Sequence, residues 1–290
     1  LYSLANLILI PISTQKDKII ILKNKSLSSS STQTMCSRNS SSITSFFIVS
    51  LLAVLVNPTI SSRAFTKEHP RVSVASNCES WRLASETNNA GSWNVVPSRC
   101  VNSVKNYING GQFENDYNIV ARYAIAYAKR INLGRDGKDA WVFDIDETLL
   151  SNLDYYKVHG YGSEPYDNAK FNEWAVQGKA SSFDGSLRLY KALKKLGFTI
   201  ILLTGRDENQ RSITEKNLRN AGYFGWNRLI LRGKNDQGKT AIQYKSEQRS
   251  KVVKEGYKIH GNTGDQWSDL QGFAVATRSF KVPNPMYYIA

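Results

Sequence analysis

The chain has 290 residues, of which 41% are hydrophobic and 21% charged, so it can form a substantial core and is not disordered throughout. This length fits one large domain or two small ones, at roughly 100–200 residues per domain. Seven prolines and no Gly-x-y period exclude a collagen-like chain. The formal net charge of +14 favours anionic partners, but the basic residues are spread along the chain, so a solvated surface is the simpler interpretation.

Residues 35–63 have the layout of a secretory signal peptide. Met35 is followed by Arg38, by an apolar run from Phe46 to Val56, and then by small and polar residues. The run is eleven residues long, whereas a bilayer span takes roughly 20, so no stable membrane anchor is expected. The alternative to a signal peptide is a buried core helix. We therefore expect residues 1–34 to be a leader outside the mature protein. The mature chain would pass through the secretory pathway to the cell wall, the extracellular space or the vacuole.

Two cysteines lie in the segment 64–135 that would follow the signal peptide. In an oxidising compartment, the isolated pair Cys78 and Cys100 is most simply one disulfide. It would close a loop of about 23 residues and contribute roughly 3 kcal/mol, while two free buried thiols are the alternative. The rest of this segment predicts a short helix around Trp81 to Glu86 and a long or broken helix over residues 104–132.

From residue 136 onward, short apolar runs alternate with amphipathic helical patterns. Strands are predicted at 140–145, 198–204, 228–231, 257–259, 273–276 and 280–282, and helices at 186–196, 209–221 and 244–255. This alternation predicts an α/β fold with a parallel sheet, helices on both faces, and ligands bound beyond the carboxyl ends of the strands.

Residues 151–183 interrupt this alternation as an irregular or partly helical insertion rich in aromatic side chains. These are Tyr155, Tyr156, Tyr161, Tyr166, Phe171 and Trp174. The insertion is placed to cover a site at the strand ends and to select a leaving group. A separate aromatic core explains the same residues equally well.

An acid pair, Asp144 and Asp146, lies at the end of the apolar strand predicted at 140–145. Two carboxylates at positions i and i+2 can face the same crevice, and their repulsion should raise the proton affinity of one of them. Such a pair can supply a nucleophile and a general acid, or it can hold a divalent ion. The alternative is an exposed strand end with Thr148 as a helix N-cap.

Two further candidates could bind phosphate. Thr204 and Gly205 follow the apolar strand that begins at Phe198, where a threonine offers a hydroxyl and a backbone N–H, and glycine permits a tight turn. Lys245, at the start of a predicted helix, could neutralise a phosphoryl group and nearby carboxylates. Most helical lysines are simply solvated, and Lys239 is a local competitor.

A second acid pair, Asp265 and Asp269, follows the predicted strand at 257–259. If both acid pairs converge, their four carboxylates repel one another unless a cation lies between them. Only oxygen ligands are on offer, with no His/Cys cluster, so Mg²⁺ fits better than Zn²⁺.

The order of these elements, acid pair, Thr, Lys and acid pair, resembles the four motifs of the haloacid dehalogenase superfamily of phosphohydrolases, whose fold is a Rossmann-like parallel sheet. Longer segments narrow the resemblance. VFDIDETLLSNLDYY, ILLTGR, YKSEQR, GNTGDQWSDL, FKVPNPMYYI and CESWRLASETNN look like the plant acid phosphatases related to vegetative storage proteins. The resemblance covers about residues 72–290 and implies a phosphatase core over 136–290, with 151–183 as a small cap-like insertion.

The resemblance also implies a role for each candidate. Asp144 would be the nucleophile and Asp146 the general acid and base, while Thr204, Gly205 and Lys245 would bind the phosphate. Mg²⁺ would be held by Asp144, the backbone carbonyl of Asp146 and Asp265, with Asp269 as a ligand or a support.

The function implied is a Mg²⁺-dependent acid phosphatase that hydrolyses small phosphate monoesters through an aspartyl-phosphate. A vegetative storage protein with weak or vestigial activity is the alternative. Some storage members lack the nucleophilic aspartate, and its presence here as Asp144 favours the enzyme. Nucleic acid is not an expected partner, because no basic–aromatic motif accompanies the positive charge, and a homodimer stays open.

Overall fold

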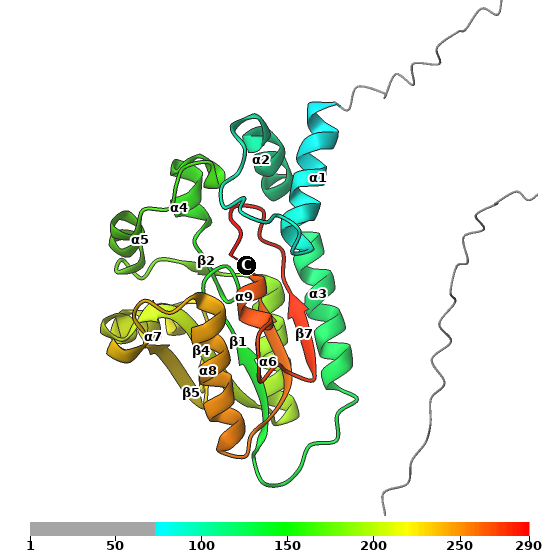
Figure 1. Ribbon diagram of the computed structural model, residues 1–290. Helices are drawn as coiled ribbons and strands as arrows, with labels where there is room; N and C mark the ends of the chain where they lie inside the picture. The colour runs from blue at the N-terminus through cyan, green and yellow to red at the C-terminus, as the bar shows by residue number, and fades with distance from the viewer. Residues whose placement is uncertain (1–72, 290) are drawn as a thin grey trace, which may run out of the picture. The chain divides into compact units, whose positions relative to one another are not determined.

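A computed structural model describes residues 73–289 of the chain (Figure 1). The expected leader (1–34) and signal peptide (35–63) lie outside these residues. None of the helices within 73–289 has the length and apolar character that crossing a bilayer requires.

The centre of the fold is a five-stranded parallel sheet in the order β5-β4-β1-β6-β7. Its strands are β1 (Asp139–Phe143), β4 (Thr199–Asp207), β5 (Arg228–Arg232), β6 (Lys258–Gly264) and β7 (Arg278–Lys281). All five residues of β1 are buried, as expected for a central strand covered on both faces.

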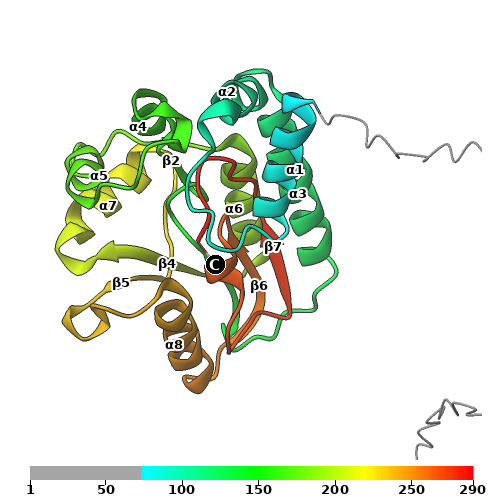
Figure 2. The ribbon, with the colours of Figure 1, turned by 45° about the horizontal axis from the view of Figure 1, so that its top comes forward.

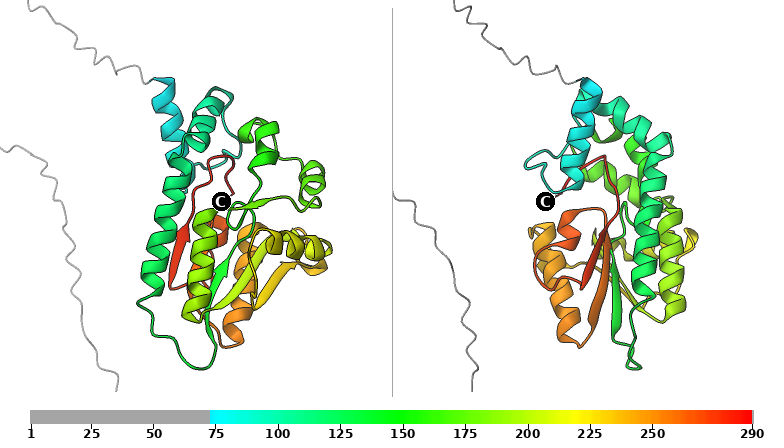
Figure 3. Two further views of the ribbon diagram at one scale, coloured as in Figure 1. Left: turned by 180° about the vertical axis from the view of Figure 1, so that it is seen from behind. Right: turned by 90° about the vertical axis from the view of Figure 1, so that its right-hand side faces the viewer.

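Helices cover both faces of this sheet, and alternate residues of β1 and β4 point to opposite faces. On one face the strands pack against α3 (Gln112–Ala128) and α6 (Asp184–Leu196), through a cluster that includes Trp141, Phe143, Ile200, Leu202, Ala124 and Leu193. On the other face they pack against α8 (Ala241–Lys254), through a cluster that includes Val142, Ile201, Leu203, Tyr244 and Val252. The right-hand view of Figure 3 shows the sheet between these layers. The predicted α/β fold with helices on both faces is confirmed.

The remaining elements lie toward the carboxyl end of the sheet or connect its strands. The insertion begins and ends with the antiparallel pair β2 (Leu150–Ser151) and β3 (Ser181–Ser182), and carries α4 (Leu153–Val158), η2 (Gly160–Gly162) and α5 (Asn168–Ala175). Shorter elements complete the core: η3 (Glu208–Gln210), α7 (Arg211–Asn220), η4 (Lys234–Asp236) and α9 (Trp267–Leu270).

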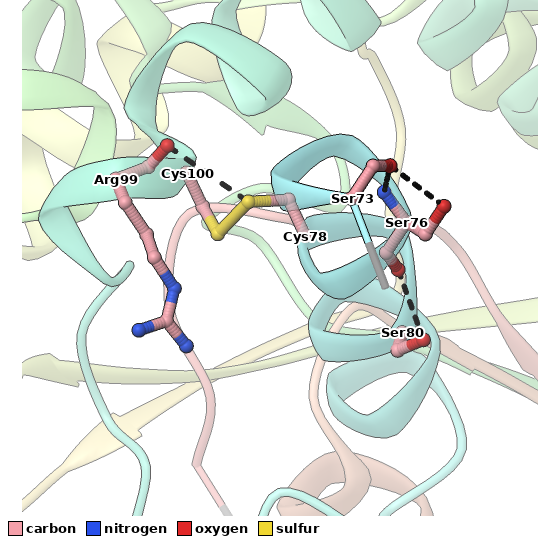
Figure 4. The surroundings of a disulfide bond; sticks show 6 residues. All are labelled: Ser73, Ser76, Cys78, Ser80, Arg99 and Cys100. Atoms are coloured by element: carbon pink, nitrogen blue, oxygen red, sulfur yellow. Dashed lines mark hydrogen bonds between the residues drawn. A yellow bond between two sulfur atoms is a disulfide. The ribbon is translucent and has the colours of Figure 1, made fainter. Parts of the chain in front are cut away.

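The N-terminal part of the described chain is helical, with α1 (Val74–Glu86), η1 (Ser98–Cys100) and α2 (Val101–Asn109) ahead of α3. The structure joins Cys78 on α1 to Cys100 in a disulfide (Figure 4), which confirms the predicted pair. The helix expected over 104–132 is broken into α2 and α3, because Gly111 adopts a left-handed φ of 84° between them.

The strand expected at 273–276 is wrong. Ala274 has a φ of 50°, which a strand does not accept, and the backbone bends around the buried Arg249 instead. The guanidinium of Arg249 donates hydrogen bonds to the carbonyls of Phe273 and Ala274, each at 3.1 Å. A side chain on another element therefore determines this loop, and no local apolar pattern reveals it.

Candidate active site

The candidate residues lie at the carboxyl end of the central strand β1, between β4 and β6. Asp144 directly follows β1, Thr204 lies in β4, and Asp265 directly follows β6. The chain leaves β1 toward β4 and β5 on one side and returns to β6 and β7 on the other, so the site lies where the strand order reverses. Ligands bind at this position in open α/β sheets.

Three buried carboxylates converge there. Asp144, Asp265 and Asp269 each offer an oxygen, and these three oxygens all lie within 4.8 Å of one another. The ammonium group of Lys245, on α8, donates to the carboxylates of both Asp144 and Asp269. The structure therefore brings together four predicted residues, two from the ends of β1 and β6 and two from α8 and α9.

The competing lysine has a different place. Lys239 forms ion pairs with Asp236 at 2.8 Å and with Glu247 at 2.6 Å. Lys245 is thus the lysine whose charge serves the carboxylate cluster.

Burial and mutual repulsion dominate the electrostatics of the cluster. Burial, followed by the negative charge of Asp269, raises the pKa of Asp144 well above its ordinary value despite Lys245. The same two causes raise the pKa of Asp265 to about 6. One lysine thus faces three carboxylates, and without a further cation the protonated forms of Asp144 and Asp265 are favoured. The three carboxylates supply hard oxygen ligands. A divalent cation fits this donor set.

Asp269 depends on a close approach to the backbone of β6. A Cβ added to Gly264 would lie 2.5 Å from Cβ and Oδ2 of Asp269, so only glycine leaves room there. The backbone N–H of Gln266 donates to Asp269 Oδ2 at 3.0 Å. These contacts fix the Asp269 carboxylate against the strand end, with its other oxygen at Lys245.

Asp146 has different partners from Asp144. Arg206 Nε lies 2.9 Å from Asp146 Oδ2, and Nη2 lies 2.7 Å from Oδ1, while Asn152 Nδ2 donates to Oδ1 at 2.9 Å. Burial raises the pKa of Asp146, but the charge and hydrogen bonds of Arg206 and the amide of Asn152 outweigh it and lower the pKa below its ordinary value. Of the acid pair, Asp144 is therefore the member whose proton affinity is raised.

Thr148 is not a helix N-cap. It is fully buried, no helix follows it directly, and its hydroxyl donates to Asp265 Oδ1 at 3.2 Å. The turn that carries it is strained at Glu147, whose φ is 56°. Glu147 Oε1 accepts a hydrogen bond from the backbone N–H of Asn152 at 2.8 Å, which ties the turn to the start of the insertion.

Thr204 and Gly205 lie in an irregular part of β4. The tight turn that Gly205 permits is not formed, since β4 continues to Asp207, although its pairing with β5 shifts register between Leu203 and Asp207. Thr204 is buried, and its hydroxyl accepts from the backbone N–H of Arg206 at 3.1 Å. Gly205 is exposed, with open space where a Cβ would lie, so its backbone is accessible.

The aromatic residues of the insertion are mostly structural. Tyr155 and Tyr156 are buried in a cluster with residues of α1 and α2, and Phe171 and Trp174 pack against it. Tyr166 is 62% exposed, and it lines a pocket of about 200 Å³ together with Tyr155 and Tyr156. Burial, and then the charge of Asp146, raises the pKa of Tyr166 to about 12.

Several polar residues of the site were missed by the sequence interpretation. Arg206 lies inside the ILLTGR segment, but nothing in the segment indicates its partner. Asn152 and Asn284 lie in loops, and single asparagines carry no periodic signal. Their contacts with Asp146 and Asp265 become apparent only in the folded chain.

Comparison with known proteins is consistent with this geometry. Residues 62–290 match the family model described as HAD superfamily, subfamily IIIB (acid phosphatase). The chain is 47% identical over 249 residues to acid phosphatase 1 of Solanum lycopersicum, a match that covers 84% of this chain and 98% of that protein. It is 38% identical over 215 residues to vegetative storage protein 1 of Arabidopsis thaliana, covering 73% of this chain and 79% of that protein.

The fold also has a counterpart among solved structures. The class C acid phosphatase from Bacillus anthracis superposes with a TM-score of 0.54 at 23% identity, over 64% of this chain and 83% of that one. At this identity the likeness concerns the fold alone. The family model and the identity to the plant proteins establish the relationship: the chain belongs to the acid phosphatase family, subfamily IIIB of the haloacid dehalogenase superfamily.

Proposed function

We propose that this acid phosphatase hydrolyses small phosphate monoesters with Mg²⁺ bound and with Asp144 as the nucleophile. The observation that carries the proposal is the contact between Asp144 and Lys245, which are 101 positions apart in the chain, beside two further buried carboxylates. A nucleophilic carboxylate needs a neighbouring cation to approach an anionic phosphate, and Lys245 is such a cation.

The carboxylates of Asp144 and Asp265 and the backbone carbonyl of Asp146 would hold Mg²⁺, with Asp269 as a further ligand or a support. When bound, the ion withdraws charge from the phosphoryl oxygens. The raised pKa values of Asp144 and Asp265 support this assignment, because a bound cation would favour the ionised carboxylates that burial and mutual repulsion disfavour. Lys245, the Thr204 hydroxyl and the accessible backbone at Gly205 would bind the remaining phosphoryl oxygens.

The reaction then proceeds in two displacements. A carboxylate oxygen of Asp144 attacks phosphorus, the bond to the leaving oxygen breaks, and Asp146 gives its proton to that oxygen to release an alcohol. Asp146 then takes a proton from water, whose oxygen attacks the phosphorus of the aspartyl-phosphate. Inorganic phosphate leaves and the Asp144 carboxylate is restored. Because Arg206 lowers the pKa of Asp146, the protonated Asp146 carboxyl that this step needs becomes more populated as the pH falls, which suits activity below neutral pH.

Turnover of p-nitrophenyl phosphate tests this function. We expect activity with Mg²⁺, its loss with a chelator, and its loss in Asp144→Asn, whose amide is not a nucleophile. Asp154→Asn is the matched control, because Asp154 is an exposed acid on α4 that pairs only with Lys157 among the described residues. Undiminished turnover in Asp144→Asn would overturn the proposed nucleophile.

The storage-protein alternative is favoured by the similarity to vegetative storage protein 1. It predicts that the protein accumulates to high levels in the tissue. After purification it should hydrolyse p-nitrophenyl phosphate no faster than Asp144→Asn does. The same assay therefore separates the two functions.

The insertion 151–183 is proposed to act as a small cap on the core 136–290 and to select the leaving group. The pocket beside Tyr166 and the effect of Asp146 on the pKa of Tyr166 support this role. Tyr166→Ala should change KM for aryl phosphates more than for alkyl phosphates. Equal changes for both would contradict selection by this residue.

We also propose that residues 35–63 direct the chain into the secretory pathway, that the mature protein begins near residue 64 with its helical segment 64–135, and that residues 1–34 are absent from it. The Cys78–Cys100 disulfide supports an oxidising destination, the cell wall, the extracellular space or the vacuole. N-terminal sequencing of the purified protein tests the cleavage. Sedimentation tests the homodimer, which stays a proposal.

A further inference from the structure

The C-terminal tail, residues 282–289, contacts the carboxylate cluster although it carries none of the four motifs. It leaves β7, runs toward the N-terminal segment and turns back toward α9 (Figures 1 and 2). Asn284, which is buried, donates from Nδ2 to Asp265 Oδ2 at 2.8 Å. This hydrogen bond connects the tail directly to a proposed metal ligand.

The orientation of the Asn284 amide is determined by its other neighbour. Asn284 Oδ1 accepts from the backbone N–H of Met286 at 2.9 Å, and a backbone N–H can only donate. The NH₂ group must therefore face Asp265. Pro283 and Pro285 flank Asn284 and restrict the backbone on both sides, so little conformational freedom is lost in holding the amide there.

The contacts of Asp265 leave a single place for a cation. Oδ2 accepts from Asn284 and from Gln266 Nε2, at 2.8 and 2.7 Å, and Oδ1 accepts from the Thr148 hydroxyl at 3.2 Å. Each carboxylate oxygen has two lone pairs, so Oδ2 is fully used and one position remains on Oδ1. The two amides therefore determine which oxygen of the Asp265 carboxylate is free to bind a cation in the cluster.

The N-terminal segment holds the tail in turn. Glu86, the last residue of α1, accepts from the backbone N–H of Asn284 at 2.9 Å and forms an ion pair with Lys281. Its carbonyl accepts from Trp267 Nε1, on α9, at 3.1 Å. The end of α1 therefore connects the tail with the helix that carries Asp269.

We propose that Asn284 is a positioning residue for Asp265 and that the tail 282–289 is in this way a part of the metal site. The inference rests on the proposed function, since Asp265 must be a metal ligand. Residues that orient a ligand through hydrogen bonds typically change metal affinity by about 10–100-fold when they are replaced. Asn284 should fall in this range.

The test is direct measurement of Mn²⁺ affinity by electron paramagnetic resonance on the intact mature protein, with no substrate present. In Asn284→Ser, the short hydroxyl can still accept from Met286 N–H, as asparagine does, but it does not reach Asp265. In Asn284→Ala both contacts are lost. Tyr288→Phe is the matched control, because it removes the tail's hydrogen bond to Asn88 and leaves Asp265 untouched.

We expect Asn284→Ser and Asn284→Ala to bind Mn²⁺ about 10–100-fold more weakly than the wild type, and Tyr288→Phe to bind it equally well. Unfolding midpoints measured with a chelator identify any variant whose fold is destabilised even without metal. If Asn284→Ala does not fold, the test relies on Asn284→Ser. Wild-type affinity in folded Asn284→Ser would overturn the positioning role while leaving the metal site intact. A wild type that binds neither Mn²⁺ nor Mg²⁺ would instead overturn the proposed metal dependence, and this inference with it.

Discussion

Arg206 donates hydrogen bonds to both carboxylate oxygens of Asp146, with Nε 2.9 Å from Oδ2 and Nη2 2.7 Å from Oδ1. Its third nitrogen, Nη1, donates to the Thr214 hydroxyl at 3.2 Å, which anchors the guanidinium to α7. Such a two-pronged contact fixes the plane of a carboxylate as well as its position. A proton donor must point at the leaving oxygen, so this geometry matters for the proposed role of Asp146.

Arg206→Gln removes the contact that orients Asp146, so it should impair proton donation more than phosphate binding, even though loss of the arginine charge makes Asp146 easier to protonate. We expect kcat for an alkyl phosphate to fall by about 10²-fold, within the range that general acid catalysis contributes. The loss should be smaller for p-nitrophenyl phosphate, whose leaving group needs less help from a proton. The measurement is kcat for both substrates in Arg206→Gln and in Arg211→Gln, a control whose arginine pairs with Glu208 and Glu215. Equal losses for the two substrates would contradict the assignment.

A second contact reaches Asp146 from the insertion. Trp174 Nε1, on α5, donates to Asn152 Oδ1 at 3.0 Å, and Asn152 Nδ2 donates to Asp146. Trp174→Phe keeps most of the ring but removes the donor, so the Asn152 amide becomes free to rotate. We expect kcat to fall several-fold, roughly the effect of one lost hydrogen bond of about 1 kcal/mol, with little change in fold.

Trp81→Phe is the matched control for this variant. Trp81 is also buried, but its Nε1 has no hydrogen-bond partner within residues 73–289. Its replacement should leave kcat unchanged. If Trp174→Phe likewise keeps full activity, the insertion does not act on Asp146 through Asn152.

The sequence predicted the parts of this site that follow from local patterns. Buried strands end where apolar runs end, so Asp144 and Asp265 could be assigned to strand ends, and the parallel order of strands then brought them to one edge. Lys245 could be placed at the start of a helix, but its choice over Lys239 rested on the family resemblance.

The contacts between side chains far apart in the chain were not predictable in this way. Asn284 and Asp265 are 19 positions apart, and Arg206 and Asp146 are 60 apart. Neither spacing is a period of a helix or strand, and no pattern of one segment indicates the other. The false strand at 273–276 has the same origin, because Arg249 on α8 determines that loop.

Gly264→Ala should damage the carboxylate cluster by steric overlap. The new Cβ would lie 2.5 Å from Cβ and Oδ2 of Asp269, so the Asp269 carboxylate has to move away from Lys245. Overpacking of this kind typically destabilises by about 1–3 kcal/mol. We expect a lower unfolding midpoint and a large loss of kcat/KM for p-nitrophenyl phosphate.

Gly233→Ala is the control, since its Cβ would meet Asp236 Oδ2 at an ordinary 3.6 Å. Full activity in Gly264→Ala would show that the position of Asp269 is not critical.

The opposite end of the sheet predicts a dependence of stability on pH. Asp139, at the start of β1, accepts a hydrogen bond from His260 at 2.7 Å, and this contact, against the effect of burial, lowers the pKa of the Asp139 carboxyl. A carboxyl whose pKa is lowered by folding stabilises the protein above its unfolded pKa, near 3.8, and this contribution disappears as the pH falls through the folded value.

In Asp139→Asn the free energy of unfolding should therefore be lower than in the wild type by about 1.5–3 kcal/mol at pH 6, the usual contribution of a hydrogen bond to a charged group. The two proteins should converge as the pH is lowered from about 4 to 2, in urea titrations of both. A difference that stays constant over this range would mean that Asp139 stabilises the sheet by packing and not through its charge.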